Sequence, residues 1–128
     1  MKKEKKKLPN WKNLILVFFA ILAIIIIFTF IDFLFHKLSE EYYVPSYYFR
    51  NKVIFGTVIG FAAFIIARKQ KLWIKSLAFS ATVSILLQAR YYLEGYPKDF
   101  VLLFLVIHFL ILLPLSAVAF WLMKKYKG

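Results

Sequence analysis

Residues 14–35 read LILVFFAILAIIIIFTFIDFLF and carry a single charged side chain, Asp32. A bilayer core is about 30 Å thick, so a helix that rises about 1.5 Å per residue needs about 20 apolar residues to cross it. A helix on the surface of a soluble domain keeps a polar face, which this stretch lacks. The stretch is also longer than the apolar region of a cleaved signal peptide. It therefore predicts an uncleaved first transmembrane helix.

The composition agrees with a membrane protein and excludes several kinds of active site. Of the 128 residues, 62% are hydrophobic, which is more than a typical soluble domain contains. The chain has no cysteine, so disulfides, thiolate metal sites and cysteine nucleophiles are excluded. It also lacks the phosphate-binding, zinc-protease and serine-hydrolase motifs. We therefore identify no catalytic residue, no metal site and no cofactor from the sequence.

Three further apolar stretches predict three more spans. We expect helices at about residues 12–37, 46–67, 72–93 and 100–123, within a single transmembrane domain that covers residues 1–128. The basic turn at residues 68–71 is so short that the helices on either side of it should be antiparallel neighbours. The expected fold is therefore all-α, a polytopic bundle of four antiparallel transmembrane helices.

The formal net charge of +12 lies on one side of this expected bundle. Of the 18 Lys and Arg residues, 13 lie in the first twelve residues, around the 68–71 turn or at the carboxyl end, accompanied by one acid, Glu4. The positive-inside rule makes this side cytoplasmic, so both termini are expected there. The three tryptophans fall at the same boundary and seven of the eight tyrosines at the other, as in interfacial belts. We interpret the lysine-rich start as a topology signal that touches anionic lipid, and expect no nucleic acid partner.

Two stripes of residues are predicted to pack helices together. The second helix carries small residues spaced four, three and four apart, namely Gly56, Gly60, Ala63 and Ala67. Such residues allow close helix contact in lipid, either with a neighbouring helix, which we favour, or with a second copy through Gly56 and Gly60. The third helix aligns Ser80, Ser84 and Gln88, which can hydrogen-bond across a helix interface. Pro114 is expected to bend the fourth helix.

Ionisable side chains inside a membrane are expensive, so each is a candidate functional residue. Asp32, Arg90 and His108 qualify, and Gln88 accompanies them in the outer half of the expected bundle. In one interpretation they form an outward-opening pocket, with Asp32 paired to Arg90 and His108 lying deeper. In the other, Asp32 and Arg90 extend to water and His108 bonds a backbone carbonyl.

Two more groups of polar residues lie near helix ends. Asp32, His36 and Glu40 recur every four residues and could share one face as metal ligands, but a solvated helix end is the interpretation we favour. Arg50 and Lys52 lie in the first turns of the second helix, where long side chains can extend to the lipid headgroups.

These features predict a small non-enzymatic integral membrane protein. We expect it to bind lipid or another apolar ligand, or to pack as an accessory subunit on a larger membrane protein. One alternative is a transporter or channel for small solutes or ions that uses the outer polar residues, and a further alternative is a membrane-embedded enzyme. Membrane lipids are the expected partners, and contact with another membrane protein is left open.

Overall fold

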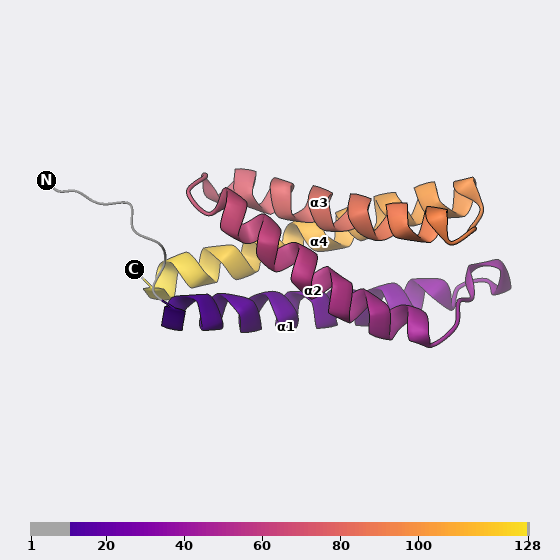
Figure 1. Ribbon diagram of the computed structural model, residues 1–128, viewed down its shortest axis with the longest axis horizontal. Helices are drawn as coiled ribbons and strands as arrows, with labels where there is room; N and C mark the ends of the chain where they lie inside the picture. Colours follow the sequence, from indigo (N-terminus) through magenta and orange to yellow (C-terminus); the bar gives the residue numbers. More distant parts are fainter. Residues whose placement is uncertain (1–10, 128) are drawn as a thin grey trace, which may run out of the picture.

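The computed structural model describes residues 11–127, with side chains from Asn13 to Lys125. Four long helices follow one another in the chain (Figure 1): α1 spans Trp11–His36, α2 Tyr47–Ala67, α3 Leu72–Leu93 and α4 Lys98–Lys127. A short 3-10 turn, η1 at Glu40–Tyr42, lies between α1 and α2. All four long helices are long and apolar enough to cross a membrane, as predicted. The lysine-rich start, which the sequence predicts to be a topology signal, lies outside the described residues.

The four helices pack as a bundle in which each contacts two others. α1 and α3 each contact both α2 and α4. In Figure 1 the start of α1, the α2–α3 turn and the end of α4 lie at one end of the bundle. We call this the basic end, because Arg68, Lys69, Lys71, Lys75 and Lys124 lie there. The α1–α2 connection and the α3–α4 turn lie at the opposite end.

The inside and the outside of the bundle are both apolar. The core contains fully buried large side chains from three helices, among them Ile21, Phe28, Phe79, Leu112 and Phe120. The outer faces also carry large apolar side chains that are exposed, among them Leu16, Phe30, Val58, Ile66 and Leu110. An exposed apolar surface that covers all the helices suits hydrocarbon rather than water.

The small-residue stripe of α2 lies against helices of the same chain. All four of its members are buried: Gly56, Gly60, Ala63 and Ala67. A Cβ added at Gly56 would lie 3.2 Å from Cγ2 of Ile25 on α1. One added at Gly60 would lie 3.2 Å from Cγ2 of Ile21 and 2.6 Å from Cε1 of Phe79 on α3. Close backbone approach of this kind provides the van der Waals contact on which helix association in lipid depends.

Polar side chains connect α3 to α4. The Ser80 and Ser116 hydroxyl oxygens lie 3.2 Å apart, and the Gln88 amide donates to the Val101 carbonyl at 2.9 Å. Ser84 is also buried, but its hydroxyl has no hydrogen-bond partner in the described part of the chain. Two of the three predicted polar positions of α3 therefore bond across this helix interface.

Two residues with unusual backbone properties lie in the second half of the chain. Gly95 has a φ of 101° in the turn between α3 and α4, a conformation that side chains with a Cβ rarely adopt. Pro114 lies inside α4, and the helix continues through it without interruption. The bend expected at Pro114 stays a prediction.

Replacing Gly60 with alanine tests the close contact between α2 and α3. The new Cβ would overlap the fully buried Phe79 ring, so we expect Gly60→Ala to lower the free energy of unfolding by about 1–3 kcal/mol. Gly56→Ala should cost less, because the nearest atom to its new Cβ is Cγ2 of Ile25 at 3.2 Å. Unfolding in mixed detergent and dodecyl sulfate would measure both. Ala62→Val on the exposed face is the control, and a Gly60→Ala protein as stable as wild type would contradict the packing.

Candidate functional site

A group of charged and polar side chains interrupts the apolar core. Asp32 of α1 and Lys52 of α2 form an ion pair in which both side chains are 0% exposed. The Lys52 ammonium donates to Oδ2 of Asp32, and its Nζ lies 2.9 Å from Nε2 of His108 on α4. The same imidazole nitrogen lies 3.1 Å from Oδ1 of Asp32. One carboxylate therefore connects three helices, and we call Asp32, Lys52, His108 and His36 the ionic cluster.

His36 extends the ionic cluster toward the end of the bundle opposite the basic end. It lies one turn after Asp32 on the same face of α1, and its Nε2 is 3.2 Å from Oδ2 of Asp32. Its Nδ1 donates to the Tyr42 carbonyl oxygen at 2.7 Å, and its ring stacks on Phe104 at a centroid distance of 4.0 Å. His36 is 2% exposed, so the solvated helix end that we favoured is wrong. The fold covers this residue because η1 returns over it, whereas Glu40 stays exposed.

Aromatic rings surround the Lys52 ammonium. Nζ lies 4.4 Å from the ring centre of Tyr48, 5.5 Å from that of Phe28 and 5.8 Å from that of Tyr91. The Tyr48 and Tyr91 rings stack on each other with centroids 4.2 Å apart. Ring faces attract a cation, so this enclosure partly offsets the loss of water around the buried ammonium.

The structure brings together only some of the residues singled out from the sequence. Asp32 and His108 lie side by side in the ionic cluster, so the interpretation in which Asp32 extends to water and His108 bonds a backbone carbonyl is wrong. Gln88 is buried at the α3–α4 interface, where it bonds Val101. The expected Asp32–Arg90 pair is wrong: Nε of Arg90 donates to Glu94 at 3.0 Å near the helix surface. The two residues are one turn apart on α3, so they pair locally.

Lys52 is the cluster residue that sequence reasoning missed. Its expected extension to the headgroups is wrong, because its side chain points into the bundle and is fully buried. The helix register could have revealed this orientation. Residues 52, 56 and 60 are four apart, so Lys52 lies on the same face as Gly56 and Gly60, which the sequence already placed at a helix interface.

Three members of the ionic cluster also form a possible set of metal ligands. Asp32, His36 and His108 offer ligand atoms that all lie within 4.8 Å of one another. However, the Lys52 ammonium already bonds two of these three residues and supplies the positive charge there. A divalent ion would place a second cationic group in the same buried space. We therefore assign no metal to the ionic cluster.

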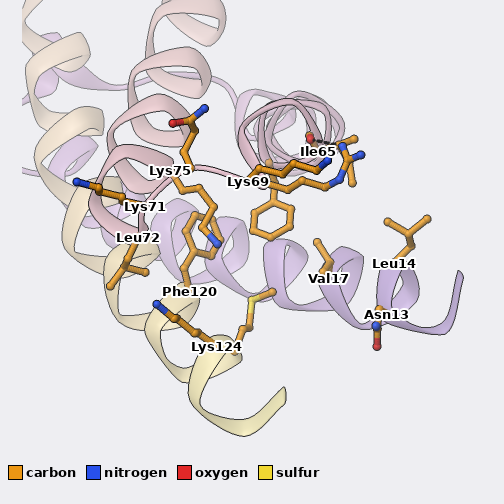
Figure 2. A pocket seen from close by; sticks show the side chains of 14 residues that line it. Asn13, Leu14, Val17, Ile65, Lys69, Lys71, Leu72, Lys75, Phe120 and Lys124 are labelled. Atoms are coloured by element: carbon orange, nitrogen blue, oxygen red, sulfur yellow. Dashed lines mark hydrogen bonds between the residues drawn. The ribbon is translucent and has the colours of Figure 1, made fainter. Parts of the chain in front are cut away.

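A cavity of about 480 Å³ opens at the basic end of the bundle (Figure 2). The described residues that line it include five cationic side chains and no acidic one, the cations being Arg68, Lys69, Lys71, Lys75 and Lys124. Its apolar lining comes from α1, α2, α3 and α4 and includes Val17, Phe64, Leu72, Phe120 and Met123. Figure 2 shows Lys75 extending alongside Phe120 toward the middle of the cavity. We call this the basic pocket.

The basic pocket adjoins an apolar groove on the side of the bundle. A groove of about 700 Å³ runs between α1 and α4, and Met123 lines both the groove and the pocket. Small side chains form part of its floor, including Ala20, Ala23 and Ala119. Within the part of the chain that the structure describes, no charged side chain lines the groove. A cationic pocket and an apolar groove therefore meet at one point.

Comparison with known proteins adds no functional information. No protein-family model, curated protein or solved structure matches the chain.

Removing one partner of the buried ion pair should destabilise the bundle. Lys52→Met leaves the Asp32 carboxylate buried without its cation, which typically costs about 3–5 kcal/mol. Adding Asp32→Asn to Lys52→Met should recover part of this loss, because no buried charge then remains unpaired. Unfolding of the two variants in mixed detergent would measure the difference.

Arg90→Met provides the matched control for this comparison. Its partner Glu94 is exposed, so the loss should be about 0–1 kcal/mol. If Lys52→Met and Arg90→Met had the same small effect, the structural role given to the ionic cluster would be wrong.

Proposed function

We propose that the protein is a small non-enzymatic integral membrane protein that binds an anionic phospholipid at the basic pocket. The observation that carries this proposal is the meeting of five cationic side chains with an apolar groove at Met123. A phospholipid likewise joins a charged phosphate at one end to apolar acyl chains at the other. The phosphate would bind in the basic pocket and one acyl chain would lie along the α1–α4 groove.

The electrostatics of the basic pocket favour an anionic ligand. Each Lys or Arg near an anionic membrane surface contributes about 1 kcal/mol of attraction. Arg68 is held in position by donating from Nη1 to the Ile65 carbonyl at 2.7 Å. Lys75 Nζ lies 5.3 Å from the ring centre of Phe64 and 6.0 Å from that of Phe120. These two cations come from α3 and from the turn before it, and both line the basic pocket.

The proposed orientation follows from the same charges. We propose that the four helices cross the membrane as antiparallel spans, with the basic end and both termini in the cytoplasm. Two exposed tryptophans at the basic end, Trp73 and Trp121, support the placement of the two ends at the membrane interfaces, as do exposed tyrosines at the opposite end, among them Tyr43, Tyr47 and Tyr92. Aromatic side chains of these types gather at the two membrane interfaces.

Neutralising the basic pocket should reduce lipid binding. We expect the double variant Arg68→Gln/Lys75→Gln to bind phosphatidylglycerol about 10- to 30-fold more weakly, because two attractions of about 1 kcal/mol each are lost. Native mass spectrometry of lipid titrations into delipidated protein would measure this. Binding of phosphatidylcholine should change much less.

The control removes two cations at the opposite end, Lys37→Gln/Lys98→Gln. Both side chains are exposed, and neither lines the basic pocket. Equal loss of phosphatidylglycerol from the two double variants would contradict a specific site and indicate attraction by net charge alone.

The absence of cysteine allows a direct test of orientation, because each introduced cysteine is the only thiol in the chain. With a membrane-impermeant maleimide on intact cells, we expect Lys98→Cys to be labelled. Lys69→Cys should be labelled only after the membrane is permeabilised. The reverse pattern, or labelling of both in intact cells, would overturn the proposed topology.

A transporter of small ions is the second candidate, and the ionic cluster is the observation that favours it. Charged side chains at membrane depth commonly mark ion or proton pathways. The four cluster residues are at most 2% exposed, however, so a solute larger than a proton would need the helices to separate.

A further inference from the structure

The neighbours of His36 largely determine which of its ring nitrogens carries a hydrogen. Nδ1 lies 2.7 Å from the Tyr42 carbonyl oxygen, which can only accept, so Nδ1 carries a hydrogen. Nε2 faces Oδ2 of Asp32 at 3.2 Å, in a geometry short of a well-aligned hydrogen bond. If Nε2 is unprotonated, its lone pair faces a carboxylate oxygen. If it is protonated, it is a cation beside that carboxylate.

Lys52 competes with His36 for the same oxygen. Its ammonium donates to Oδ2 of Asp32, the atom that His36 also faces. A buried cluster is least costly when it is neutral, so one carboxylate is matched by one cationic proton. Two groups that contact Oδ2 can carry that proton, the Lys52 amine and the His36 imidazole.

The contacts of His108 are compatible with the proton on either Lys52 or His36. Its Nε2 lies 2.9 Å from Lys52 Nζ and 3.1 Å from Oδ1 of Asp32, while its Nδ1 has no hydrogen-bond partner in the described part of the chain. With hydrogen on Nδ1, Nε2 accepts from the ammonium. With hydrogen on Nε2, the ring donates to Asp32 and Lys52 no longer needs to be charged. Either tautomer of His108 therefore has a hydrogen-bond partner within the cluster, whichever of Lys52 and His36 carries the proton.

The His36 side of the cluster adjoins a surface cavity. A cavity of about 240 Å³ lies at the α1–α2 connection, lined by His36 together with Phe33, Lys37, Tyr43, Val44, Ser46 and Phe49. Within the described residues, His36 is the one cluster member in this lining. Water in this cavity could therefore exchange a proton with His36, whereas Lys52 and His108 are 0% exposed.

We propose that the ionic cluster is a proton-binding site that exchanges protons with the α1–α2 end of the bundle through His36. The proton leaves Nζ of Lys52 for Oδ2 of Asp32, which gives a neutral amine and a neutral carboxyl group. It then moves to Nε2 of His36, which restores the carboxylate and forms an imidazolium, so the net charge of the cluster stays zero. Loss of this proton to water in the cavity, or uptake of another, changes that charge by one.

Other titratable side chains facing the cluster do not interfere with this exchange. Tyr48 of α2 and Tyr91 of α3 face it, and their buried hydroxyls have no hydrogen-bond partner among the described residues. Tyrosine ionises at a pH of about 10 in water, so both phenols remain neutral near physiological pH. On α1 and α4 the facing groups are Asp32, His36 and His108 themselves.

The chain has two histidines, which makes nitrogen NMR of ¹⁵N-histidine-labelled protein in lipid nanodiscs a direct test. Spectra recorded from about pH 8 down to pH 5 should show the imidazole nitrogens of His36 changing shift, as proton exchange at this ring requires. The His108 shifts should change in the same step, because His36 and His108 contact the same carboxylate, that of Asp32. Shifts of both rings that do not depend on pH over this range would overturn the proposal.

The variant His36→Gln tests the route. It should abolish or strongly slow the response of His108 to pH, because glutamine cannot take the proton from Asp32. Tyr48→Phe, which removes a hydroxyl without a hydrogen-bond partner, should leave both responses unchanged and shows whether a substitution beside the cluster disturbs it in general. A full His108 response in a folded His36→Gln protein would exclude His36 as the route. If His36→Gln does not fold, the coupled shifts of the wild-type protein alone decide the proposal.

Discussion

The ion pair between Asp32 and Lys52 is the interaction around which the polar interior is arranged. Asp32 is the one acidic side chain buried within the described residues, and its two oxygens contact groups from α1, α2 and α4. In lipid no water can compensate for a missing partner, so a buried carboxylate requires these contacts. An apolar bundle would accept several arrangements of its helices. The buried carboxylate restricts them to the one in which Lys52 and His108 both reach Asp32.

This arrangement depends on close packing elsewhere on α2. Lys52 lies on the face that carries Gly56 and Gly60, where the backbone comes close to Ile25, Ile21 and Phe79. A larger residue at either glycine would move α2 away from α1 and lengthen the distance between Lys52 and Asp32. The small residues and the ion pair are thus two parts of one helix interface, the first providing contact and the second fixing the register.

Hydropathy was sufficient to predict the four long helices, because each is a long apolar run between turns that contain charge, glycine or proline. The cost of burying charge was sufficient to single out Asp32 and His108, which lie together. The cost of burying charge could not identify the cation that pairs with Asp32, since Lys52 and Arg90 both lie near helix ends in the sequence. Only the register of α2 and the local pairing of Arg90 with Glu94 distinguish them. The basic pocket could not be predicted from the sequence for another reason: it combines side chains from four helices.

The length of α4 has a consequence for the surrounding bilayer. Its 30 residues extend about 45 Å at about 1.5 Å per residue, which exceeds a hydrocarbon thickness of about 30 Å. A helix this long either tilts or projects beyond the acyl chains, and the preferred compromise changes with membrane thickness. α4 carries His108 and also lines the basic pocket and its groove. A thinner or thicker membrane that changes the tilt of α4 would therefore act on both the ionic cluster and the basic pocket.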